Sequence, residues 1–404
     1  MPMKIVLLNH SMRCGGAERV TANLANNWAE RGCDVAVATF VSSDADFYKL
    51  DSRVARVDLA LASASSGVLG GMLANVRRLA AVRRLFKDRR PDVVIGVMTV
   101  PSVLCILAGI GLRLKVIATE HNHPPMLRMN AVWEMLRSLT FRHADAVVAL
   151  TAETSTWLAR HCRCRNVSII PNPVALPMEV MEPRIAPEET ISTDTRLLLA
   201  VGRLAPQKGF DLLIQAFEKI RDRGPGWKLV ILGEGEAREA LLSAISERGL
   251  DDLVLMPGRA GNIGEWYGRA DLYVMSSRFE GLPMTLMEAM GSGCAAVSFD
   301  CDVGPRDIIR DGIDGVLVSP SGDVGALANA LLRLMVDHQE RERMASMAND
   351  VAARFAPPRI LSLWEKLFLS MGLSGADHAR PPQREACETN SRAVEHSCDK
   401  TQMR

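Results

Sequence analysis

Two carboxylates stand eight residues apart in the segment SSRFEGLPMTLMEAMGSG, which spans residues 276–293. An apolar strand, DLYVMS, leads into this segment, and its run PMTLMEAM predicts a helix that ends at small residues. Glu280 is then expected in the loop before the helix, and Glu288 on its second turn. Between them, the backbone N–H groups of Gly281 and Leu282 lie at a helix N-terminus, which favours a bound anion. An anion site between two acids suits a ligand with both a phosphate and hydroxyl groups, as a nucleotide sugar has.

Two cations follow another apolar strand, LLLAV, at its carboxyl end. They are Arg203 and Lys208, and the ligands of an open parallel sheet bind at this end of the strands. An arginine fork and a lysine point charge together suit a diphosphate, although two solvated surface bases are the plain alternative. The anion site beside Glu280 favours the diphosphate. The next strand, KLVIL, runs into Gly233, and because Arg238 replaces the third glycine of a dinucleotide fingerprint, we expect only a tight turn beside the ligand.

The first half of the chain adds two candidate residues at the ends of predicted strands. Gly16 lies in the first strand-to-helix loop, where a bare amide can approach a phosphate, or where the glycine only begins a helix. His121 follows the strand KVIAT and is either a contact for a sugar hydroxyl or reacting centre, or a structural histidine. Two Asp-x-Asp triplets, at residues 44–46 and 300–302, could chelate Mg²⁺. Because an arginine and a lysine already supply cations, we expect hydrogen-bonded turns there and no metal site.

Repeated units of strand, helix and strand must position these residues. One such unit occupies residues 4–40, and similar units recur to residue 170, which predicts a parallel sheet with both faces covered by helices. Five prolines between residues 171 and 187 interrupt the alternation, and it restarts at residue 196. The predicted organisation is a Rossmann-like domain over 1–172, a linker over 173–194, a second Rossmann-like domain over 195–354, a last helix over 355–372 and a disordered polar tail over 373–404.

Composition argues against several classes of protein. Of the 404 residues, 48% are apolar and 24% are charged, which is typical of globular domains with substantial cores. The nine cysteines include no Cys-x-x-Cys pair, which favours reduced thiols in the cytoplasm over a disulfide framework or a zinc site. We expect no secretory leader and, because no apolar run reaches about 18 residues, no membrane span.

Charge is distributed unevenly along the chain. The first 175 residues carry 22 Lys and Arg against 13 Asp and Glu, a balance of +9, whereas the net charge of the whole chain is +1. The segment Asn75–Arg90, NVRRLAAVRRLFKDRR, contains seven bases and one acid among apolar residues. It is either an amphipathic helix on an anionic membrane surface or a core-packed helix with a basic outer face. The basic first half favours a peripheral position on the inner face of the cytoplasmic membrane, and we expect no nucleic-acid partner.

Four motifs together resemble the retaining glycosyltransferases of family 4: GGAER at 15–19, VGRL followed by QKG at 201–209, GEG at 233–235, and EGLP followed by LMEAM at 280–290. The segment 298–318 is similar to members that build bacterial polysaccharides or lipid-linked oligosaccharides, and the similarity extends over residues 3–371. The resemblance implies the α/β GT-B fold, in which two Rossmann-like parallel-sheet domains face each other across a cleft. The first domain would bind the acceptor and the second the nucleotide sugar, and the last helix would cross back to the first.

The resemblance also implies roles for the candidate residues. Glu288 would bind the ribose hydroxyls, and Glu280 the hydroxyls of the donor sugar near its anomeric carbon. Arg203 and Lys208 would neutralise the diphosphate leaving group without a metal. The remaining donor contacts would come from Gly16, Gly233, Gly281 and Leu282, from His121 beside the sugar, and from Gly258 and Ile263 in a loop around the nucleobase.

The expected activity is a metal-independent transfer of a hexose or N-acetylhexosamine, with retention of configuration, from a UDP-sugar to a lipid-linked saccharide. The catalytic residues would be Glu280, His121, Arg203 and Lys208, and no cofactor is expected. Other chemistry on the same fold, a nucleotide-sugar 2-epimerase or a glucan phosphorylase, is the first alternative. A nucleotide-binding scaffold without activity is the second.

Overall fold

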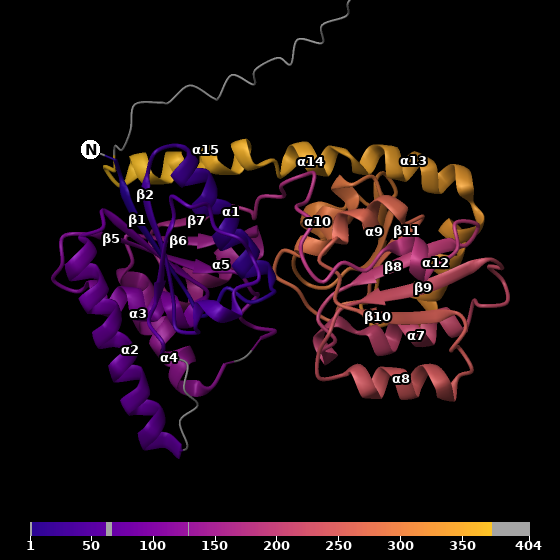
Figure 1. Cartoon of the computed structure of the whole chain (residues 1–404), viewed down its shortest axis with the longest axis horizontal. Helices are drawn as coiled ribbons and strands as arrows, with labels where there is room; N and C mark the ends of the chain where they lie inside the picture. Colours follow the sequence, from indigo (N-terminus) through magenta and orange to yellow (C-terminus); the bar gives the residue numbers. More distant parts are fainter. Residues whose placement is uncertain (1, 62–66, 128, 374–404) are drawn as a thin grey trace, which may run out of the picture.

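The protein contains two parallel β-sheets, each covered by helices, which lie side by side (Figure 1). The computed structural model describes residues 2–61, 67–127 and 129–373. The predicted α/β class with two Rossmann-like sheets is confirmed. Apart from Leu373, the tail predicted to be disordered lies outside the described residues.

The first sheet has seven parallel strands in the order β3-β2-β1-β4-β5-β6-β7. Its inner strands β2, β1, β4, β5 and β6 are rich in Val, Ile, Leu and Ala because helices bury both faces of the sheet there, whereas the edge strands β3 and β7 are not buried. The strands are β1 (Lys4–Asn9), β2 (Asp34–Thr39), β3 (Ala55–Asp58), β4 (Val93–Val97), β5 (Lys115–Glu120), β6 (Ala146–Ala149) and β7 (Val167–Ile169). The helices among them are α1 (Gly16–Glu30), α2 (Gly67–Arg89), α3 (Thr99–Gly109), α4 (Ala131–Thr140) and α5 (Ala152–His161).

The second sheet has six parallel strands in the order β10-β9-β8-β11-β12-β13. They are β8 (Arg196–Val201), β9 (Trp227–Leu232), β10 (Val254–Gly258), β11 (Leu272–Met275), β12 (Ala296–Phe299) and β13 (Gly315–Val318). The helices of this half are α7 (Phe210–Glu218), α8 (Arg238–Glu247), α9 (Ile263–Arg269), α10 (Met284–Gly291), α11 (Pro305–Ile308), α12 (Val324–Val336), α13 (His338–Ala348) and α14 (Asp350–Arg354). The predicted linker is not wholly irregular, because it contains the short helix α6 (Pro187–Thr190).

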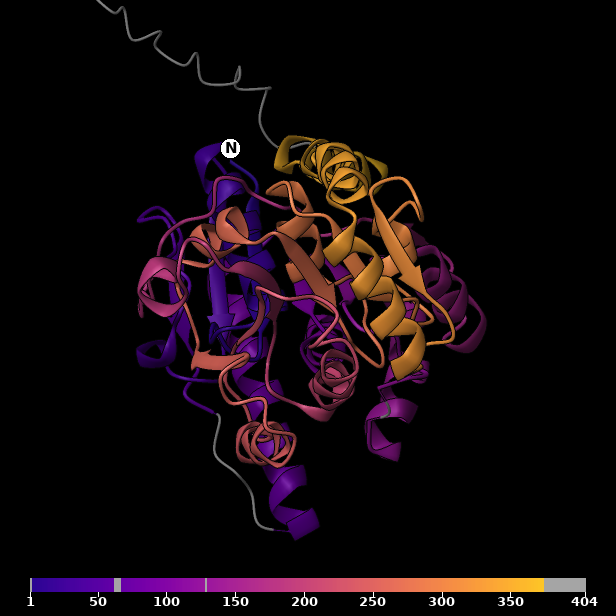
Figure 2. The ribbon, with the colours of Figure 1, turned by 90° about the vertical axis from the view of Figure 1, so that its right-hand side faces the viewer.

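The last helix, α15 (Pro357–Ser370), lies against the first domain. Helices α13, α14 and α15 form a row along one side of the molecule, which leads from the second domain back to the first (Figure 1). Figure 2 shows this row nearly end-on at the top. The Trp364 ring meets the Trp28 ring of α1 edge to face, with centroids 5.6 Å apart, and Phe368 lies equally close to Trp28. The helix thus completes the apolar core of the first domain. It begins at Pro357, within the predicted range of 355–372, and proline is compatible with a first helical turn.

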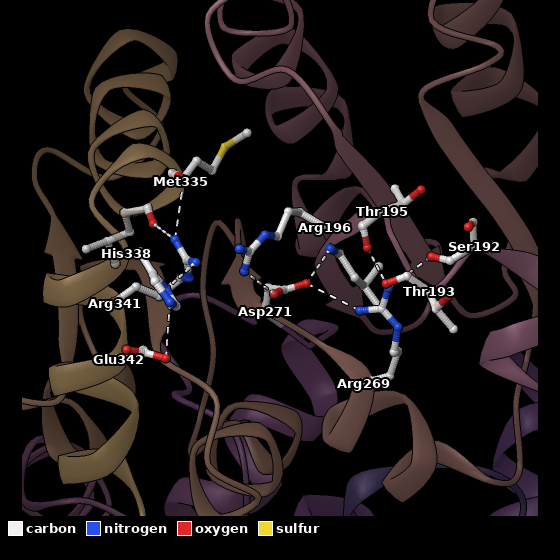
Figure 3. Close-up of polar contacts among 12 residues, drawn as sticks. Ser192, Thr193, Thr195, Arg196, Arg269, Asp271, Met335, His338, Arg341 and Glu342 are labelled. Atoms are coloured by element: carbon white, nitrogen blue, oxygen red, sulfur yellow. Dashed lines mark hydrogen bonds and ion pairs between the residues drawn. The ribbon is translucent and has the colours of Figure 1, made fainter.

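Ion pairs at the amino ends of the central strands β8 and β11 fix the end of the linker (Figure 3). Arg196 Nη1 donates to Asp271 at 3.0 Å, and Arg269 Nη1 donates to the same carboxylate at 3.3 Å. The other Nη of Arg269 donates to the carbonyls of Ser192, Thr193 and Thr195. This network lies at the amino ends of β8 and β11, so it leaves the carboxyl ends of these strands for the site.

No helix within the described residues is both long and apolar enough to cross a membrane.

Candidate active site

The carboxyl ends of β8 and β11 carry the candidate cations and one candidate acid. These strands are neighbours at the centre of the second sheet, and the chain order reverses between them. Ligands of open α/β sheets bind at such a switch point. Arg203 and Lys208 follow β8, and Glu280 follows β11. The structure therefore brings together Lys208 and Glu280, which lie 72 positions apart in the sequence.

An ion pair joins the two loops. Lys208 Nζ donates to Glu280 Oε1 at 2.6 Å, and Ser277 Oγ donates to the same oxygen at 2.5 Å. The Glu280 side chain is only 7% exposed, so the lysine supplies the counter-charge that a buried carboxylate needs. Ser276 Oγ donates to the Lys208 carbonyl at 3.0 Å, which fixes the lysine-bearing loop.

Glycines allow these loops to lie against one another. A Cβ on Gly209, which has a φ of +63°, would lie 2.1 Å from the Ser276 carbonyl oxygen. Gly233 has a φ of +150°, and its Cβ would lie 1.9 Å from the carbonyl oxygen of Gly202. Any larger residue would separate the loops. Gly233 therefore forms the expected tight turn, one strand away from Lys208.

The start of α10 meets the first domain. A Cβ on Gly281 would lie 2.0 Å from the His121 carbonyl oxygen, and a Cβ on Gly16 would lie 3.5 Å from Met284. The two halves of the chain thus touch at the predicted site. Among the described residues, the buried amides of Gly281 and Leu282 donate to no backbone acceptor, so both remain available to an anion.

Glu288 is buried within α10 and is paired with a residue of the other domain. Arg19 Nη1 donates to Glu288 Oε1, and Tyr267 Oη donates to Glu288 Oε2 at 3.2 Å. The Glu288 side chain is 4% exposed. Burial is the largest single influence on the Arg19 guanidinium and lowers its pKa, but Glu288, Tyr48 and Tyr267 together outweigh burial and raise the pKa. The acid predicted to bind ribose is therefore held by a cation from α1.

The loop predicted to surround a nucleobase is bonded to the linker. Gly261 N donates to the Pro183 carbonyl at 2.7 Å, and Asn262 Nδ2 donates to the Ile185 carbonyl at 2.9 Å. A Cβ on Gly264 would lie 3.6 Å from Met178. Two further predicted residues of this region are Gly258, with a φ of +109°, and the buried Ile263. The linker thus forms one wall of this part of the site.

His121 follows β5 and faces the interior with its ring. Nε2 lies 3.0 Å from Thr119 Oγ1, whereas Nδ1 is buried and has no partner among the described residues. The ring lines a cavity of about 10 Å³ between the first sheet and Trp364. Burial lowers the pKa of the imidazole to about 4, so the ring is neutral at pH 7. The backbone of His121, at Gly281, is the part that lies at the contact between the domains.

Arg203 is exposed and acts on the first domain. Burial raises the pKa of Glu18 on α1, and the Arg203 charge is one of the influences that oppose this shift. Ser11 Oγ donates to Glu18 at 3.2 Å. The Arg203 side chain is therefore near enough to Glu18 to influence it, and an exposed guanidinium can reach a phosphate.

One aspartate of each Asp-x-Asp triplet is hydrogen-bonded to an arginine elsewhere in the chain. Both oxygens of Asp300 accept hydrogen bonds from Arg306 at 3.0 Å, and Arg56 Nε donates to Asp46 at 2.6 Å. No three His, Cys, Asp or Glu side chains gather as metal ligands in the part of the chain that the structure describes. Asp46 and Asp300 thus have arginine partners in this structure.

Sequence reasoning missed three residues at the site. Arg19 is the last residue of the motif GGAER, in which a role was predicted for Gly16 alone. Ser277 stands three residues before Glu280. Tyr267 lies on α9 and is fully buried beside Glu288. The position of Arg19 within a recognisable motif was the one available signal.

Two Rossmann-like parallel sheets that lie side by side are the GT-B fold, which solved structures of sugar-transferring enzymes share. Residues 14–176 match the family described as "Glycosyltransferase Family 4", and residues 181–351 match "Glycosyl transferases group 1". The chain belongs to this family 4-like group of glycosyltransferases.

Two curated relatives are named as glycosyltransferases, and a third is named as a phosphotransferase. The chain is 28% identical to the amylovoran biosynthesis glycosyltransferase AmsD of Erwinia amylovora, over 90% of this chain and 98% of that protein. It is 26% identical to an α-1,4-N-acetyl-D-galactosaminyltransferase of Campylobacter jejuni whose name refers to an undecaprenol-diphosphate-linked glycan, over 90% and 98% of the two chains. An exopolysaccharide phosphotransferase of Streptomyces coelicolor is 30% identical over 95% of this chain, which spans 42% of that protein.

Solved structures share the fold at low sequence identity. Sucrose-phosphate synthase of Thermosynechococcus elongatus superposes with a TM-score of 0.79 at 18% identity, and covers 92% of this chain and 99% of its own. HepE of Anabaena, in complex with UDP-glucose, superposes with a TM-score of 0.74 at 21% identity, over 90% and 99% of the two chains.

Proposed function

We propose that the protein transfers a hexose or N-acetylhexosamine from a UDP-sugar to a lipid-linked saccharide, with retention of configuration, during synthesis of a cell-surface polysaccharide. The pairing of Lys208 with Glu280 at the switch point between β8 and β11 carries this proposal. It brings a cation, a buried acid and the start of α10 to one place. Such a combination suits a sugar joined to a diphosphate.

The leaving diphosphate sets the chemical demand on the site. When the bond between the sugar and the diphosphate breaks, negative charge develops on the phosphate oxygens. Lys208, Arg203 and the amides of Gly281 and Leu282 would stabilise this charge without reorganisation. Lys208 would exchange its contact with Glu280 for phosphate oxygens, and Glu280 would then accept hydroxyls of the donor sugar.

Similar proteins support the choice of donor and acceptor. HepE was solved with UDP-glucose, and its fold superposes on this chain, which supports a nucleotide-sugar donor. The names of the relatives from Erwinia and Campylobacter refer to amylovoran synthesis and to an undecaprenol-diphosphate-linked glycan, and the chain covers 98% of each. A lipid-linked acceptor would place the enzyme at the inner face of the cytoplasmic membrane.

Release of UDP from candidate donors tests the proposal. We would incubate the purified protein with the UDP derivatives of glucose, galactose, N-acetylglucosamine and N-acetylgalactosamine in the presence of EDTA. A synthetic undecaprenyl-diphosphate-linked saccharide would serve as acceptor. We expect UDP release that depends on the acceptor, and a product with the anomeric configuration of the donor, measured by NMR coupling constants.

Each part of the proposal has its own contrary result. Loss of activity in EDTA would contradict metal independence, and inverted product would contradict retention. Conversion of the UDP-sugar to its 2-epimer without transfer would favour the epimerase alternative. Phosphate-dependent release of glucose 1-phosphate from a glucan would favour a phosphorylase.

A further inference from the structure

An ion pair between the two domains lies where the ribose of the donor is expected to bind. Arg19, on the first turn of α1, donates to Glu288 on α10, so the bond links the two domains. The same Nη1 of Arg19 lies 3.5 Å from the sulfur of Met178 in the linker, and the guanidinium lies 5.3 Å from the centre of the Tyr48 ring. Three segments distant in the sequence thus hold one cation over the acid predicted to bind ribose.

The ion pair covers the carboxylate. With Arg19 in place, one Glu288 oxygen accepts from the arginine and the other accepts from Tyr267, and the side chain is 4% exposed. A ribose that binds a carboxylate donates two hydroxyls to it. Because little of Glu288 faces solvent, those hydroxyls reach it only after Arg19 has moved away.

The rest of the predicted site is equally closed. Gly281 lies against the His121 backbone, and Gly16 lies beside Met284. The pocket lined by Lys208, Ser277 and Glu280 is too small to hold a water molecule. A nucleotide sugar therefore enters only when the domains separate, and separation breaks the bond between Arg19 and Glu288.

We infer that Arg19 competes with the ribose of the donor for Glu288, and that this competition sets the affinity of the enzyme for its nucleotide sugar. The inference rests on the proposed binding of ribose by Glu288. A donor that enters must displace Arg19, so the measured dissociation constant equals the intrinsic one divided by the fraction of molecules in which the ion pair is broken. Arg19 thus lowers the affinity for the nucleotide sugar, although it is a cation and the ligand is an anion.

The Arg19→Gln variant tests the competition in an informative direction. Removing a positive charge near a diphosphate weakens binding by simple electrostatics, whereas removing a competitor strengthens it. We expect the dissociation constant of UDP, measured by isothermal titration calorimetry at pH 8, to fall about threefold or more. If Arg19→Gln fails to fold, Arg19→Met, which keeps an unbranched side chain but cannot donate to Glu288, is expected to strengthen binding as well.

Arg31→Gln is the matched control. Arg31 is the residue that follows α1, and it forms an ion pair with Glu365 of α15, but it has no contact with Glu288. Its removal takes away the same charge from the same domain. We expect the affinity for UDP to remain within twofold of wild type.

Glu288→Gln separates failure of this inference from failure of the proposed function. If Glu288→Gln weakens UDP binding but Arg19→Gln leaves it unchanged or also weakens it, the competition is refuted and the ribose contact stands. If neither Glu288→Gln nor Arg19→Gln changes the affinity for UDP, both the ribose assignment and the competition are wrong. A wild-type protein that binds none of UDP, GDP or ADP would refute the proposed function and this inference together.

Discussion

Individual side chains at this site are held by partners from distant segments. Lys208 reaches Glu280 from the neighbouring strand loop, and Arg19 reaches Glu288 from the other domain. Each acid is buried and each is matched by one cation, which avoids the cost of an unpaired buried charge. The order of the site therefore depends on a few polar pairs as well as on the apolar core.

Replacing Lys208 tests the phosphate end of the site. We expect Lys208→Ala to lower kcat by about 10²- to 10³-fold, because a fixed cation that faces the leaving diphosphate is lost. Glu280→Gln should lower kcat by a similar factor. Steady-state UDP release measures both, and circular dichroism confirms the fold. Lys366→Ala, an exposed lysine on α15, is the control, and wild-type rates in Lys208→Ala and Glu280→Gln would show that the site is wrongly assigned.

The buried imidazole of His121 predicts a pH dependence of stability. Its pKa is 6.5 in the unfolded chain and about 4 in the folded protein, so the unfolded state binds more protons between these values. The free energy of unfolding should therefore fall as the pH is lowered from 6.5 to 4. Urea denaturation at several pH values measures this slope. His121→Asn, which does not titrate, should show a shallower slope, and an unchanged slope would mean that His121 does not contribute.

The sequence located one part of the site and not the other, for a physical reason. Glu280, Lys208 and Gly233 follow parallel strands of one sheet, and the ends of such strands converge at one edge. Arg19 and Tyr267 meet Glu288 through the relative placement of two domains and through side-chain packing. No local pattern in the chain encodes that placement.

Helix α2 is buried in one part and exposed in another, and only its packing against the core is shown. Val82 and Phe86 are buried in the core of the first domain, as expected of a core-packed helix. Nearer its amino end, Met72, Leu73 and Val76 are more than half exposed, beside the basic residues that follow. The part of α2 that contains Val82 and Phe86 therefore packs in the core of the first domain. The part nearer its amino end remains available to a membrane surface.

Vesicle sedimentation tests this role of α2. We expect the protein to bind vesicles of phosphatidylcholine with 30% phosphatidylglycerol, and to bind pure phosphatidylcholine weakly. Changing Met72 and Val76 together to Asp should reduce binding about tenfold or more, because two buried side chains are lost from the lipid phase. Met347→Asp, at an exposed position of α13 in the second domain, is the control. Binding that depends neither on lipid charge nor on these residues would exclude this surface.

Some elements gave no clear signal before the structure. Helix α3 is apolar on nearly every side and contains Pro101, so its sequence shows no helical period. Strand β3 has only four residues, none of them buried. Both are defined by tertiary contacts, α3 by its packing between the first sheet and α2. The longer strands, buried on both faces, were predictable because their composition alone indicates a covered parallel sheet.

At the scale of the whole molecule, the contact between the domains depends on a glycine. Gly281→Ala places a Cβ 2.0 Å from the His121 carbonyl oxygen, so the domains can no longer approach as they do here. We expect a loss of transfer activity, a larger radius of gyration by small-angle X-ray scattering, and an unfolding midpoint near that of wild type. Gly268→Ala, whose Cβ meets nothing within 4 Å, is the control. An active and equally compact Gly281→Ala protein would mean that this contact is dispensable.

The packing of α15 on the first domain affects the order in which the molecule is completed on the ribosome. Trp28 emerges early, but Trp364 and Phe368, which cover it, are synthesised more than 300 residues later. Throughout that interval the nascent first domain exposes an apolar face, a surface of the kind that chaperones bind and that aggregates form through. The domain that is made first is thus the last to be finished, and its integrity depends on synthesis reaching residue 370.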